Sequence, residues 1–146
     1  MAGAEANVTV VRQVYDALNR RDAEAALAAF DPGAELDWSS AIGPYKGVYK
    51  GGEEGRGFLA GVWDLVEQAT FDLEETVEAG EQVAVRVRVR LRGAASGAET
   101  EASGGHLFAL RGGKVIRFRL FQTWEEALEA IKSGGPGSVD DRDLTG

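Results

Sequence analysis

Within residues 83–92, every odd position is valine or leucine, and four of the five even positions are arginine. Successive side chains on a β-strand point to opposite faces, so this segment predicts a strand with one apolar face and one cationic face. Such a strand is stable only when its apolar face is covered. The chain must therefore contain a sheet with one side turned away from water.

Segments with weaker alternation supply the neighbouring strands. Three of them are expected to form an antiparallel meander with residues 83–92, and they span 70–78, 99–110 and 114–123. Turns or loops separate them at 79–81, 93–98 and 111–113. A shorter strand is predicted at 34–38, where Leu36 and Trp38 share one face and Asp37 lies on the other.

Helical periodicity occupies most of the N-terminal half. Apolar spacing predicts helices at 8–18, at 23–30 and from Glu53 onward, and a short closing helix at 125–131. Pro32 and Gly33 end the second helix, and residues 39–52 are expected to be a loop. Helices that precede an antiparallel meander predict an α+β fold, with three N-terminal helices packed on one face of a curved sheet.

Length and charge limit what the chain can be. At 146 residues it fits one domain, assigned to residues 7–132, and the Gly-, Ser- and Asp-rich residues 133–146 are expected to be a disordered tail. With 24 acidic and 16 basic residues, the net charge of −8 argues against nucleic-acid and membrane partners. Neither a secretory signal nor an apolar run of roughly 20 residues is visible, so cytoplasmic localisation is expected.

Reactive side chains are few. The chain has no cysteine and one histidine, which excludes a thiol nucleophile, a disulfide and a metal site built on several histidines. Adjacent glutamates at 53–54 and 74–75 are expected to be solvated, so no metal site is assigned to them. No cofactor is expected.

Three strings, in this order and spacing, resemble a known family. They are VRQVYDALN at 11–19, VYKG at 48–51 and HLFALRGGKVIRF at 106–118. The chain resembles the SnoaL-like branch of the NTF2-like (ketosteroid isomerase-like) superfamily over about residues 7–132. The resemblance implies a cystatin-like cone, usually dimeric through the sheet, with a small-molecule pocket between sheet and helices. It implies no single activity, since the fold carries isomerases, cyclases, hydrolases and binding proteins.

Strand parity and the resemblance together nominate the pocket lining. Outside the last strand, the main candidates are Tyr15, Trp38, Phe58, Trp63, Phe108 and His106. For the last strand two sets remain open: Arg117, Arg119, Phe121 and Thr123, or Ile116, Phe118 and Leu120. We prefer the first set, because the SnoaL-like cyclases place a catalytic aspartate on that parity, near Thr123.

Three residues are candidates for catalysis. His106 can exchange a proton near neutral pH, and the resemblance aligns it with the protonated carboxylic acid of ketosteroid isomerases. An inward Arg119, or Arg117 beside it, would need an anionic partner, which favours a ligand with a carboxylate, enolate or carbonyl oxygen. Asp37 is a candidate base only if a one-residue bulge turns it inward. The alternatives are a structural histidine and solvated arginines at the rim.

The sequence also departs from the catalytic patterns of the family. Trp38 stands near the position of the isomerase base, Thr123 near that of the cyclase aspartate, and Val14 near that of the isomerase tyrosine. Three functions therefore remain open: an isomerase, cyclase or hydrolase acting on a carbonyl-bearing apolar substrate, a non-catalytic binding protein, or a structural dimer with a filled core. A cavity of about 300 Å³ or more would favour the first two.

The cationic face of residues 83–92 needs its own partners. Glu99 and Glu101 on the next strand are expected to pair with these arginines. A two-fold homodimer through this sheet face is expected.

Overall fold

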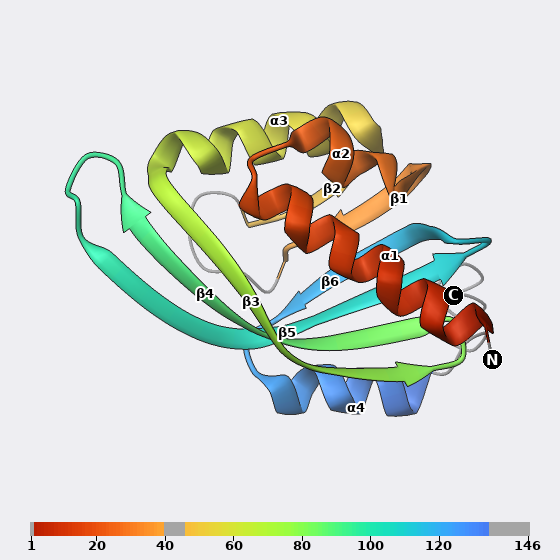
Figure 1. Cartoon of the computed structure of the whole chain (residues 1–146). Helices are drawn as coiled ribbons and strands as arrows, with labels where there is room; N and C mark the ends of the chain where they lie inside the picture. The colour runs from red at the N-terminus through yellow and green to blue at the C-terminus, as the bar shows by residue number, and fades with distance from the viewer. Residues whose placement is uncertain (1, 40–45, 135–146) are drawn as a thin grey trace.

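The computed structural model describes residues 2–39 and 46–134, which form one six-stranded sheet and four helices (Figure 1). The helices are α1 (Ala2–Asn19), α2 (Ala23–Ala28), α3 (Gly51–Leu65) and α4 (Trp124–Gly134). The strands are β1 (Phe30–Asp37), β2 (Val48–Lys50), β3 (Val66–Ala79), β4 (Gln82–Gly93), β5 (Glu99–Arg111) and β6 (Lys114–Phe121). Their order across the sheet is β2-β1-β6-β5-β4-β3. The predicted α+β class is confirmed.

The four long strands form the predicted antiparallel meander, with Val85 opposite His106 and His106 opposite Leu120. The strand β1 is different, because it pairs in parallel with β6. The sheet is therefore mixed, whereas sequence periodicity predicted antiparallel pairing throughout. Periodicity defines the faces of a strand but does not say which neighbour it takes.

The helices lie on both sides of the sheet (Figure 1). The helices α1, α2 and α3 cover the concave face, where Val11, Val14 and Tyr15 of α1 pack into the main core. On the opposite face, α4 packs on β5, β4 and β6 through Ala127 and Ile131. The closing helix was predicted, but its position behind the sheet was not.

The segment boundaries differ from prediction around the second helix and the following loop. Helix α2 ends at Ala28, and β1 already begins at Phe30, because the chain pairs with β6 there and shifts register before Glu35. Part of the predicted loop is strand β2, and residues 40–45 of it lie outside the described residues. Helix α4 runs to Gly134, and the rest of the predicted tail, 135–146, lies outside them too.

Gly104 and Gly105 of β5 allow residues 121–127 to pass close behind this strand. A Cβ atom on Gly105 would lie 2.6 Å from the Cβ of Ala127 in α4 and 3.1 Å from the carbonyl oxygen of Thr123. On Gly104 it would lie 3.0 Å from the carbonyl oxygen of Phe121. These approaches require glycine, and they position α4 directly behind the strand that carries His106.

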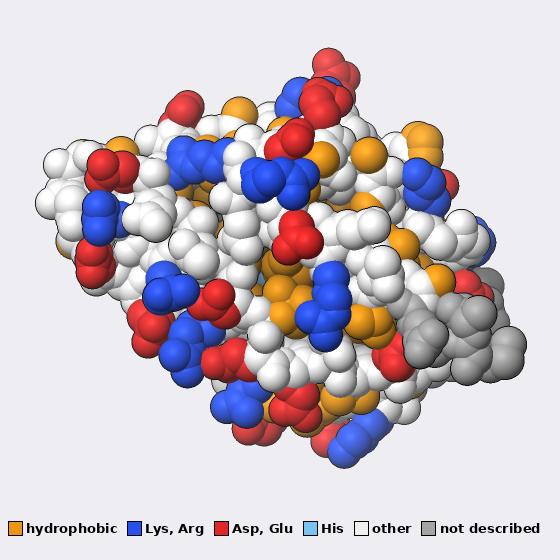
Figure 2. Space-filling view, in the orientation of Figure 1, with side chains coloured by type: hydrophobic (Ala, Val, Ile, Leu, Met, Phe, Trp, Pro, Cys, Tyr) orange, Lys and Arg blue, Asp and Glu red, His pale blue; other side chains and the backbone are white. Residues whose placement is uncertain are grey.

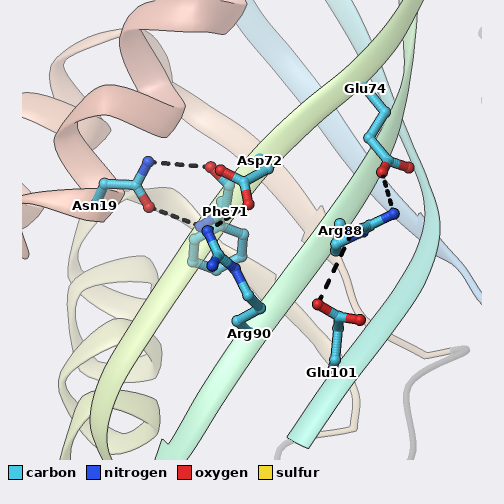
Figure 3. Close-up of polar contacts among 7 residues, drawn as sticks. All are labelled: Asn19, Phe71, Asp72, Glu74, Arg88, Arg90 and Glu101. Atoms are coloured by element: carbon cyan, nitrogen blue, oxygen red, sulfur yellow. Dashed lines mark hydrogen bonds and ion pairs between the residues drawn. The ribbon is translucent and has the colours of Figure 1, made fainter.

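The arginines of β4 form ion pairs on the outer face, and Figure 3 shows those of Arg88 and Arg90. Arg92 contacts Glu99 at 2.8 Å and Arg88 contacts Glu101 at 4.0 Å, which confirms the predicted pairing with β5. The strand β3 adds partners that were not predicted: Asp72 lies 2.8 Å from Arg90, and Glu74 lies 2.9 Å from Arg88. The outer face carries charge of both signs.

Candidate functional site

A cavity of about 350 Å³ lies between the concave face of the sheet and the helices α1, α2 and α3. Apolar side chains are visible in the middle of this side of the molecule, between charged ones (Figure 2). The volume exceeds the threshold that separates a ligand pocket from a filled core. It therefore keeps the two small-molecule functions open and disfavours the structural one.

Aromatic rings form much of the cavity wall. Trp38 and Phe58 lie with their ring centroids 4.8 Å apart, and Phe108 packs edge-on to Phe118 at 5.0 Å. The predicted lining residues Tyr15, Trp38, Phe58, Trp63 and Phe108 all border the cavity. They come from α1, α3, β5 and the position that directly follows β1.

His106 and Tyr15 form a buried polar pair in the cavity wall. The Tyr15 hydroxyl lies 2.5 Å from Nδ1 of His106, and the two side chains are only 2% and 4% exposed, respectively. Their rings are nearly parallel, at 7°, with centroids 5.9 Å apart. Phe118 packs edge-on to the imidazole at 4.9 Å. The imidazole is therefore held on three sides, by a hydrogen bond, by a ring and by the strand.

Burial determines the protonation of this pair. It lowers the pKa of His106 to about 3 and raises the pKa of Tyr15 well above its usual value of 10, so both side chains are neutral at pH 7. Two arrangements satisfy this contact: the Tyr15 hydroxyl donates to Nδ1 and the ring hydrogen resides on Nε2, or Nδ1–H donates to the hydroxyl oxygen. His106 borders the cavity and no described residue accepts a hydrogen bond from Nε2.

The preferred parity of the last strand was wrong. In β6, Phe118 lies opposite Phe108 and Leu120 opposite His106, so these apolar side chains face the cavity. Arg117 and Arg119 alternate with them and point to the other face. An arginine on the cavity side would have to be buried without a counter-charge, which is why the apolar set lies inside.

The other two residues of the preferred set, Thr123 and Phe121, also lie outside the cavity or at its edge. Thr123 caps α4 instead: its Oγ1 accepts from the Glu126 amide at 3.1 Å, and its own amide donates to Glu126 Oε1 at 3.2 Å. Phe121 borders the cavity but packs into the apolar cluster beneath α4, with the Arg119 guanidinium 4.8 Å from its ring centre.

Asp37 does not reach the cavity. The register of β1 places Leu36 opposite Phe118, so Asp37 falls on the outer face beside Arg117, 3.8 Å away. Its Oδ1 also accepts a hydrogen bond from the Ser39 amide at 3.0 Å. The register shift in β1 occurs before Glu35, too early to turn Asp37 inward. The bulge that would have made it a base is absent from this part of the strand.

The family assignment follows from comparison with known proteins. The model of the SnoaL-like domain matches residues 11–118, which is most of the chain. The chain belongs to the SnoaL-like domain family. Among curated proteins, none matches the sequence.

Solved structures share the fold of this SnoaL-like domain. An NTF2-like protein of unknown function from Burkholderia pseudomallei is 25% identical, with a TM-score of 0.72 over 86% of this chain and 97% of the other. A candidate SnoaL-like polyketide cyclase from Jannaschia is 20% identical, with a TM-score of 0.71 over 89% and 94%. A protein with a ketosteroid isomerase-like fold from Catenulispora acidiphila, in complex with trimethylamine, is 15% identical, with a TM-score of 0.70 over 87% and 93%.

Some features of this SnoaL-like domain were not predicted. Phe71 of β3 borders the cavity, but nothing in the pattern of its strand distinguished it from other strand residues. The contact between Tyr15 and His106 joins residues 91 positions apart, which single-sequence periodicity cannot detect. In residues 2–39 and 46–134, no three His, Cys, Asp or Glu side chains come together as a metal site would require. No helix of this part of the chain could span a membrane.

Proposed function

We propose that this SnoaL-like domain binds a small apolar molecule through a hydrogen bond from Nε2 of His106 to a carbonyl oxygen. The observation that carries the proposal is the buried Tyr15–His106 pair at the wall of a mostly apolar cavity, whose other polar side chains, Ser103 and Gln122, are exposed. A buried donor without a partner is unfavourable, so a ligand oxygen at Nε2 would stabilise the site. The trimethylamine complex of the Catenulispora neighbour supports small-molecule binding within this fold.

The role of His106 in this proposal is that of a neutral donor. With its pKa lowered to about 3, it does not act as a protonated acid near pH 7. A neutral imidazole can still polarise a carbonyl group. In this proposal Tyr15 is a positioning residue: its hydroxyl donates to Nδ1, which places the ring hydrogen on Nε2.

Binding without catalysis is the form of this proposal that the geometry favours. Isomerisation or cyclisation through an enolate needs a base near the α-carbon of the substrate. None of the described residues that border the cavity is an aspartate or glutamate, and Asp37 points away. Among the described residues that border the cavity, His106 would have to serve as the base of an isomerase, cyclase or hydrolase, and its lowered pKa makes it a weak one.

Titration calorimetry with a straight-chain methyl ketone tests the binding proposal. The His106→Ala variant should bind about 10- to 100-fold more weakly than the wild type, the effect of losing one buried hydrogen bond. Tyr15→Phe should weaken binding less, because Nε2 of His106 remains available to donate to the ligand. Arg119→Ala is the matched control, and it should leave the affinity unchanged. Equal affinities for wild type and His106→Ala would refute the role of His106.

We also propose that the protein is a cytoplasmic homodimer. The part of the outer face over β3, β4 and β5 carries exposed charges of both signs, which a two-fold related copy could match. Light scattering at micromolar concentration should give twice the mass of one chain, and a monomeric mass would contradict it. The absence of cysteine suits a reducing compartment. Cell fractionation checks the location.

A further inference from the structure

The cavity wall differs from the rest of the molecule in its lack of charge. None of the described residues that border the cavity is Asp, Glu, Lys or Arg. The arginines of β4 point away from it and pair with carboxylates on the outer face, and Arg117 lies beside Asp37. A charged group on a ligand would therefore lose its hydration in the cavity and gain no counter-charge.

The cavity also has a buried end and an exposed end. Tyr15, His106 and Phe108 are at most 4% exposed. Exposure rises along β5 toward Ala102, along β4 toward Leu91 and along α3 toward Trp63. Three independent elements thus show the same gradient of exposure, which rises from the Tyr15–His106 pair to the end of the cavity at Ala102, Leu91 and Trp63. We call this exposed end the mouth.

The path between the two ends is apolar and long. From His106 to Ala102 the strand β5 advances four residues, which is roughly 13 Å at about 3.3 Å per residue. Val87, Val89 and Phe71 border the space along this path. A ligand that fills it needs an apolar body of comparable length. Among the described residues that border the cavity, the buried polar groups are the Tyr15 hydroxyl and the His106 imidazole.

We infer that the cavity selects uncharged, elongated apolar molecules with an oxygen group at one end. That end enters first and meets Nε2 of His106, and the apolar tail extends toward Leu91 and Trp63. The inference rests on the proposed function and adds to it the charge, the shape and the direction of the ligand.

A ligand series separates this inference from the proposed function. Methyl ketones of increasing chain length should gain about fourfold in affinity per methylene, the transfer value for a buried CH₂, until the tail reaches the mouth. The fatty-acid anion of equal length, measured at pH 8, should bind at least about 100-fold more weakly than the ketone. If no ketone binds, the proposed function fails. If ketone and anion bind equally and both depend on His106, only the inference fails.

A charge placed at the mouth tests the direction. The probe is a methyl ketone with a carboxylate at the far end of its chain. If the ketone end lies at His106, the carboxylate reaches the mouth, and Leu91→Arg should raise the affinity for this keto acid about tenfold relative to the affinity for the simple ketone. Val48→Arg, on exposed β2 away from the cavity, is the control and should change neither. No gain with a correctly folded Leu91→Arg variant, judged by its unfolding midpoint, would overturn the direction.

Discussion

The two faces of β4 carry opposite chemistry although they alternate residue by residue. Val83, Val85 and Val87 on the concave face are at most 1% exposed. On the other face, the side chains of Arg88 and Arg90 are about half exposed and pair with carboxylates of β3 and β5. The charged side chains of β4 thus lie on the side that water reaches. Among the described residues, those that border the cavity are all neutral.

The comparison extends to β6, where Phe118 and Leu120 face the cavity and Arg117 and Arg119 face away. One consequence is chemical: in the proposed function, hydrogen bonding to a ligand depends on the neutral Tyr15–His106 pair. Another is energetic. Introducing a charged side chain on the concave face should lower the free energy of unfolding much more than removing one from the outer face. The predictions below test that difference.

The largest effect should follow from placing a charge inside. Val85 is 0% exposed and lies opposite His106. Val85→Lys should destabilise the fold by about 3–5 kcal/mol, because the ammonium group would be buried without a partner. Urea unfolding measures the loss. The neighbouring Arg86→Val is the matched control, and it should cost less than about 1 kcal/mol. Similar losses for the two variants would mean that the faces do not differ as described.

The second effect is a pH dependence that belongs to the concave face. Folding lowers the pKa of His106 to about 3, so below pH 6.5 the unfolded chain binds more protons than the folded one, and stability falls on acidification. The contribution lost between pH 7 and pH 5 should be about 2 kcal/mol. Urea unfolding at several pH values measures it. The His106→Asn variant cannot titrate there, so its stability should fall by that much less, and parallel curves would contradict the burial of a neutral imidazole.

The third effect concerns the outer face directly behind His106, where α4 packs closely on β5. Gly105→Ala would place a methyl group 2.6 Å from the Cβ of Ala127, and α4 would have to move away from β5. We expect a loss of roughly 1–2 kcal/mol in thermal or urea unfolding. The control is Gly57→Ala on α3, where nothing lies within 4 Å, and it should be neutral or stabilising by up to about 1 kcal/mol. An unchanged Gly105→Ala variant would mean that α4 packs loosely.

The sequence alone was sufficient to predict where alternation is strong and uninterrupted. The faces of β4, the α+β class and the pairing of Arg92 with Glu99 all follow from a period of two and from opposite charges on adjacent strands. Helix spacing likewise predicted that Tyr15 and Trp63 point toward the sheet. These features are local or join neighbouring strands.

The prediction failed for the last strand, where the resemblance to the cyclases was preferred over the cost of burying an arginine. The apolar residues Phe118 and Leu120 could have been assigned to the cavity because they avoid burying a guanidinium group, but the cyclase resemblance favoured the arginine parity instead. The hydrogen bond of Tyr15 to His106 was beyond prediction for another reason. It depends on how α1 crosses the sheet, which no pattern in either segment encodes.

The smallest effect should come from the outer face. Arg90 and Asp72 lie 2.8 Å apart, with side chains 56% and 46% exposed, so water screens the pair. A double-mutant cycle with Arg90→Met and Asp72→Asn should give a coupling of about 0.2–1 kcal/mol in urea unfolding. In 1 M salt, where the screening length is about 3 Å, most of that coupling should disappear. A coupling above about 2 kcal/mol, or one that salt leaves unchanged, would mean that the pair is shielded from solvent. In that case the contrast between an ionic, solvated face and a neutral, buried one would have to be abandoned for this end of the sheet.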